Sequence, residues 1–131
     1  MKTEHLHLSV LEEILAVCRL GPDAPVPAWA TSGMFFSITR TMDELSIVCP
    51  ISSLAADVTA ETGWRAIKIA GPLDFNLVGV LASITSTLAN AAVSIFAIST
   101  YDTDYILVRG SDLDHAIDAL VSDGHHVNQV A

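Results

Sequence analysis

Basic side chains are scarce in this chain of 131 residues, in which six lysines and arginines stand against fifteen aspartates and glutamates. The formal net charge of −9 is spread evenly: three basic and eight acidic residues occur up to Glu61, and three basic and seven acidic residues follow it. The sequence therefore has no basic patch, which argues against nucleic acids and anionic membranes as partners.

Cysteine is equally sparse, since only Cys18 and Cys49 occur, each inside an apolar run. We expect buried, reduced thiols; a disulfide between the two remains an alternative if their strands are neighbours.

The first thirteen residues lack the uninterrupted apolar core of a signal peptide. The most hydrophobic segment, residues 76–98, contains Asn, Ser and Thr and changes period near Ala92, so it predicts a helix followed by a strand, not a membrane span. The expected location is the cytoplasm.

Catalytic and metal-binding patterns are also missing. The chain has no glycine-rich nucleotide loop, and neither cysteine has an evident neighbouring base. His5 and His7 would share one face of a strand and His125 and His126 would point to opposite faces, but neither pair has zinc spacing to a third ligand. We therefore expect no enzyme, no metal and no cofactor.

The second half has the clearest periodicity. The expected elements are a strand over 64–71, a helix over 76–90, strands over 93–98 and 105–109, a helix over 111–124 that stops at Gly124, and a short last strand from residue 125. This β-α-β-β-α-β order is that of a ferredoxin-like domain, in which both helices cover one face of an antiparallel sheet.

The first half has a similar order with less helix. Strands are expected over 6–11, 13–20, 34–41 and 44–50. Three prolines within residues 22–30 allow only a short helix there, and residues 51–63 are expected to be a linker or a loose crossing segment. We therefore predict an α+β protein of two tandem ferredoxin-like subdomains, residues 1–62 with reduced helices and residues 63–131.

A polar insert, Ser99-Thr-Tyr-Asp-Thr-Asp104, separates the two strands of the expected hairpin. Ser, Thr and Asp side chains bond turn backbone locally, so the turn alone can account for them. A metal ion between Asp102 and Asp104 is disfavoured, because no further carboxylate cluster accompanies them. A bound ligand is the other explanation.

Residues 71–108, and most specifically the Ser-Thr-Tyr-Asp-x-Asp run at 99–104, resemble an ACT domain of the aspartate-kinase-like type. Within that group the chain is similar to small bacterial tandem-ACT proteins and to the CASTOR amino-acid sensors, over roughly residues 13–122. The resemblance implies a non-catalytic regulatory protein that binds a small ligand, in most cases an amino acid, between domains or subunits. It also implies a homodimer. The alternative is a structural or protein-interaction module without a small-molecule ligand.

The resemblance further implies where the ligand would lie, between the loop that enters the first helix and the hairpin. The site residues carried over are Leu73, Asp74, Phe75, Asn76, Leu77, Val78 and Gly79 in the loop, and Ser99, Thr100, Tyr101 and Asp104 in the hairpin. Amides at a helix N-terminus suit the carboxylate of an amino acid, and the Asp104 carboxylate suits its ammonium group. Asp74 could instead cap the helix, and Gly79 could serve close packing of helix against sheet.

Overall fold

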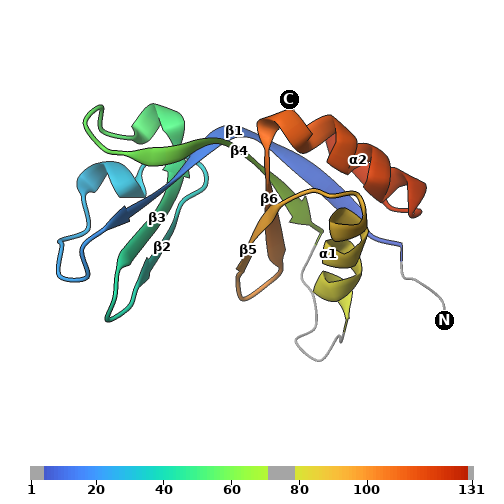
Figure 1. Cartoon of the computed structure of the whole chain (residues 1–131), viewed down its shortest axis with the longest axis horizontal. Coiled ribbons are helices and arrows are strands. Elements are labelled where there is room, and N and C mark those ends of the chain that lie inside the picture. Colours follow the sequence, from blue (N-terminus) through green and yellow to red (C-terminus); the bar gives the residue numbers. More distant parts are fainter. Residues whose placement is uncertain (1–4, 71–78, 130–131) are drawn as a thin grey trace. The chain divides into compact units, whose positions relative to one another are not determined.

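A computed structural model describes residues 5–70 and 79–129 (Figure 1). The chain forms two compact units: a central unit, Glu13–Trp64, and a terminal unit, which combines the residues up to Glu12 with those from Arg65 onward. The strands β1 (His7–Leu20) and β4 (Ala60–Ile69) each run through both units. This division differs from the expected boundary between residues 62 and 63, because the segments expected as two strands, 6–11 and 13–20, form one continuous strand.

The central unit is a ferredoxin-like frame whose helices are reduced to single turns. Between β1 and β4 the chain forms η1 (Ala28–Thr31), β2 (Ser37–Arg40), β3 (Leu45–Pro50) and η2 (Ile51–Ser53). The strand order β2-β3-β1-β4 is the one that a β-α-β-β-α-β chain produces, with a 3-10 turn in place of each helix. The central unit thus has a ferredoxin-like strand order with reduced helices. The segment expected as a linker or a loose crossing segment, 51–63, forms η2, an irregular stretch over 54–59 and the start of β4.

Both cysteines lie in the core of the central unit. In the antiparallel pairing of β1 with β3, Cys18 stands opposite Ile47 and Ala16 opposite Cys49, so the two cysteines occupy diagonal positions on neighbouring strands. Both are free, buried thiols, as expected. Burial raises the pKa of both thiols, and the proximity of Cys18 raises the pKa of Cys49 further.

The terminal unit contains the predicted β-α-β-β-α-β order. After β4 the chain forms α1 (Val80–Asn90), β5 (Ile95–Ser99), β6 (Asp104–Arg109), η3 (Gly110–Asp112), α2 (Leu113–Ser122) and β7 (His126–Gln129). One pairing was not expected: the N-terminal part of β1 lies between β4 and β7, and β7 pairs with it in parallel. The first strand of the chain therefore takes the place beside β4 that a simple ferredoxin-like sheet gives to its last strand.

Glycines set the helix ends in the terminal unit. Helix α1 begins at Val80, four residues later than predicted, because Gly79 adopts a left-handed conformation with φ +90°. Gly124, with φ +97°, follows the end of α2, as the sequence predicted.

The two helices pack against the sheet through one apolar core. Its fully or nearly fully buried members come from β1, β4, both helices, β6 and the segment before β5, and are Leu8, Val10, Ile67, Ile69, Ile84, Leu88, Val93, Ile106, Val108, Leu113, Ala116 and Leu120. No helix within residues 5–70 and 79–129 is long and apolar enough to cross a membrane.

Candidate functional site

The polar hairpin between β5 and β6 satisfies much of its own hydrogen bonding. The two strands pair in an antiparallel ladder that ends where Ser99 stands opposite Asp104. Across the turn, the Thr100 N–H and hydroxyl both donate to the Thr103 carbonyl, at 2.8 and 3.0 Å, and the Thr103 N–H donates to Thr100 Oγ1 at 3.3 Å. The Ser99 hydroxyl donates to Asp104 Oδ1. The side chains of Ser99, Thr100 and Asp104 therefore all form hydrogen bonds within the turn itself.

Thr103 fixes the position of this turn. Its side chain is only 5% exposed, and its hydroxyl donates to the Ile69 carbonyl at 2.6 Å. Ile69 is the last residue of β4, and the segment that leads to α1 follows it. The turn is thus held beside the end of β4. No local sequence pattern distinguishes Thr103 from its neighbours, because its partner lies 34 residues away.

The remaining predicted site residues have mixed outcomes. The loop residues from Leu73 to Val78 lie outside the residues that the structure describes. Gly79 does not pack closely, since a Cβ there would meet no described atom within 4 Å; its role is the left-handed start of α1, where its carbonyl accepts the Ser83 N–H at 2.8 Å. Tyr101 is 82% exposed at the tip of the turn, and Asp104 is half-buried.

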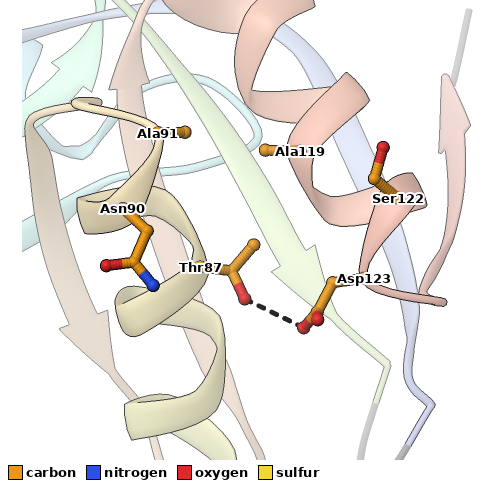
Figure 2. A pocket seen from close by; sticks show the side chains of 6 residues that line it. All are labelled: Thr87, Asn90, Ala91, Ala119, Ser122 and Asp123. Atoms are coloured by element: carbon orange, nitrogen blue, oxygen red, sulfur yellow. Dashed lines mark hydrogen bonds between the residues drawn. The ribbon is translucent and has the colours of Figure 1, made fainter.

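A second feature is a groove between the C-terminal ends of α1 and α2 (Figure 2). It has a volume of about 330 Å³ and is lined by Thr87, Asn90, Ala91, Ala119, Ser122 and Asp123. The Thr87 hydroxyl donates to Asp123 Oδ2 at 2.9 Å, and Nε2 of the buried His125 lies 3.5 Å from the same oxygen. Side chains of the protein itself therefore contact the Asp123 carboxylate. None of the residues that line the groove was predicted to belong to a site.

Side chains that bind metals do not gather in the described residues. Within 5–70 and 79–129 no three His, Cys, Asp or Glu side chains are arranged to hold an ion. The pair considered from the sequence, Asp102 and Asp104, accordingly has no third carboxylate or imidazole ligand there.

Two family models match successive parts of the chain. The ACT domain model matches residues 59–122, and a separate model of an N-terminal domain matches residues 13–57. The mouse protein named cytosolic arginine sensor for mTORC1 subunit 1 is 33% identical over 103 residues, which cover 76% of this chain and 31% of that protein. The chain therefore spans less than a third of the length of that relative.

Two solved structures share the fold of this chain. Protein Atu0741 from Agobacterium tumefaciens is 39% identical, with a TM-score of 0.93 over 98% of this chain and 96% of that chain. The regulatory subunit of aspartate kinase from Thermus thermophilus shares the fold at 11% identity, with a TM-score of 0.61 over 88% of this chain and 95% of that one. The chain thus belongs to the ACT-domain family and is CASTOR-like.

Proposed function

We propose that this protein is a non-catalytic, cytoplasmic regulatory protein that binds a free amino acid and acts as a homodimer. Membership of the ACT-domain family supports a regulatory role, and the name of the mouse relative, an arginine sensor, supports an amino acid as the ligand. The ligand would lie between the loop 73–79 and the hairpin 99–104. Its carboxylate would accept hydrogen bonds at the loop, and its ammonium group would donate to Asp104.

One observation carries this placement, the hydrogen bond from Thr103 to the Ile69 carbonyl. Ile69 ends β4 and precedes the loop residue Leu73 by four positions in the sequence, so the bond holds the hairpin turn at the end of β4 from which the chain continues toward that loop. Ala70, the last described residue before the loop, and the hairpin turn therefore lie at the same end of β4, and the loop would supply the second segment of the site. A ligand with a carboxylate and an ammonium group a few ångströms apart needs two such segments.

Asp104 has the properties that an ammonium partner needs. Its side chain is half-buried, and the Ser99 hydroxyl orients it through Oδ1. An ionised carboxylate has about four acceptor positions, so one hydroxyl does not exhaust it. A charge-assisted hydrogen bond to such a group contributes about 1.5–3 kcal/mol, which is roughly a 10- to 150-fold effect on affinity.

The test is isothermal titration calorimetry of the full chain against the twenty amino acids, with arginine first because of the mouse relative's name. We expect one class of amino acid to bind, and Asp104→Ala to weaken binding by about 10- to 150-fold. Asp102→Ala is the matched control, because it removes an exposed carboxylate from the same turn and should leave the affinity unchanged. Equal losses in the two variants would contradict the assigned role of Asp104.

A protein-interaction module is the second candidate, and the hairpin favours it in one respect. The contacts of Ser99, Thr100 and Asp104 within the turn provide a use for these polar groups without any ligand. A panel in which none of the twenty amino acids binds the folded wild-type chain would select this alternative. Light scattering of the same sample tests the homodimer separately, and a monomer at micromolar concentration would exclude it.

A further inference from the structure

Four of the five histidines meet where the N-terminal segment of the terminal unit pairs with β7. His7 stands directly opposite His126 in the parallel ladder, and their rings stack with centroids 4.9 Å apart and planes at 16°. His5 lies against Gly124, where an added Cβ would come within 2.7 Å of its Nε2. The fifth histidine, His115, lies apart on α2 and contacts the Ala91 carbonyl at 2.9 Å.

His125 is the buried member of this group, with 3% of its surface exposed. Its Nδ1 accepts the Leu6 N–H at 3.1 Å, and the His126 N–H donates to the Leu6 carbonyl at 2.9 Å. Both backbone polar groups of Leu6 are therefore bonded to two consecutive histidines. The bond to Nδ1 requires a lone pair on that atom, so the ring is neutral and carries its proton on Nε2. Nε2 makes no hydrogen bond of normal geometry, and the Asp123 carboxylate lies 3.5 Å away.

We propose that His125 forms a pH-sensitive clamp, which holds β7 on β1 while its imidazole is neutral and releases it when the ring becomes positively charged. Protonation of His125 would place an N–H at Nδ1 facing the Leu6 N–H, so that two donors oppose each other in a buried site.

The charged and titratable groups around His125 decide the sign of the effect. Burial lowers the pKa of His125, and the neighbouring His5 and His126 lower it further, whereas Asp123 opposes both effects. In the released segment, His125 would have the ordinary histidine pKa of about 6.5, so in mild acid the released state binds more protons than the paired state. The contribution of His125 to the pairing is therefore complete above about pH 6.5 and is lost as the pH falls from there toward the lowered pKa of the paired state.

Release of β7 would have two structural consequences. Leu6 and Val127, which pack against the core of the terminal unit, would lose that contact. The edge of β1 that β7 covers, from His7 to Val10, would expose unpaired backbone groups, which another strand could bind. The clamp would thus couple acidity to the availability of a strand edge, independently of amino-acid binding.

The test is amide hydrogen exchange by NMR on the full chain at pH 7.5 and 5.5, with EDTA present so that metal binding does not contribute. We expect the protection factors of the Leu6 and His126 amides to fall by about tenfold or more at pH 5.5, because a buried donor loses its acceptor. Protected amides in the β5–β6 ladder should change much less. An equal fall in that ladder would show general destabilisation and would overturn the proposal.

Two variants assign the effect to the clamp. His125→Asn places a non-titrating side-chain carbonyl near the position of Nδ1, and we expect it to abolish the acid-induced loss of protection. His115→Gln, the matched control, should keep the loss unchanged. If His125→Asn does not fold, the ring protons of wild-type His125 provide the decisive measurement, and a titration midpoint at or above 6.5 would overturn the proposal.

Discussion

The bond from Thr103 to Ile69 allows a sharp test of how the hairpin is held. Thr103→Val replaces the hydroxyl by a methyl group of similar size and removes the donor to the Ile69 carbonyl. Because Thr103 is only 5% exposed, water has little access to the carbonyl that loses its partner. A buried acceptor left unpaired costs about 1–3 kcal/mol, and we expect the free energy of unfolding to fall by that amount.

Urea denaturation followed by circular dichroism measures this loss. With a slope of about 2 kcal/mol per molar urea, a loss of 1–3 kcal/mol lowers the midpoint by roughly 0.5–1.5 M and leaves the slope unchanged. Thr85→Val is the matched control, because the Thr85 hydroxyl donates to the Ala82 carbonyl on a solvent-accessible part of α1, where water can replace it. That substitution should change stability by no more than about 0.5 kcal/mol.

Equal midpoints for the two variants would refute the reasoning. They would mean that the Ile69 carbonyl finds another partner, or that the extra buried methyl of valine offsets the lost bond. The hairpin would then not depend on Thr103 for its place beside β4, and the proposed ligand site would lose its main structural support.

Two further predictions concern the central unit. Gly63→Ala should lower the free energy of unfolding by about 1–2 kcal/mol, because Gly63 has a positive φ. Gly33→Ala should lower it by about 1–3 kcal/mol more, because the added Cβ would also collide with the Pro50 side chain. Equal shifts of the thermal unfolding midpoint in the two variants would contradict this. Cys18 and Cys49 should react with a thiol reagent at neutral pH far more slowly in the folded chain than in urea, because both thiols are buried and their pKa values are raised. Rapid labelling of either cysteine in the folded chain would contradict their burial.

Local patterns were enough to predict most of the secondary structure. The stop at Gly124 follows from backbone chemistry at a single residue, and the apolar faces of α1 and α2 follow from the helical spacing of residues such as Ile84, Leu88 and Leu120. The start of α1 was predicted less well. The pattern extends back to residue 76, and only the left-handed conformation of Gly79 shows that the helix begins at Val80.

The candidate site was predictable only in part. The residue types in the hairpin indicated dense hydrogen bonding, and the structure places Ser99, Thr100 and Asp104 in it. Thr103, which anchors the hairpin, has the same residue type as Thr100 and gives no separate signal, since its role depends on a carbonyl on another strand.

The sequence by itself determined the α+β class, the β-α-β-β-α-β order of the second half and the reduced helices of the first, because each depends on periodicity, glycine or proline within a few residues. Only the tertiary structure decided that β1 is one strand shared by both units and that it lies between β4 and β7. It alone also buried His125 beside Leu6, while the adjacent His126 remains exposed. The pairing of β1 with β7 and the contact of Leu6 with His125 join residues more than a hundred positions apart, and their energy comes from contacts of the folded state that no local pattern contains.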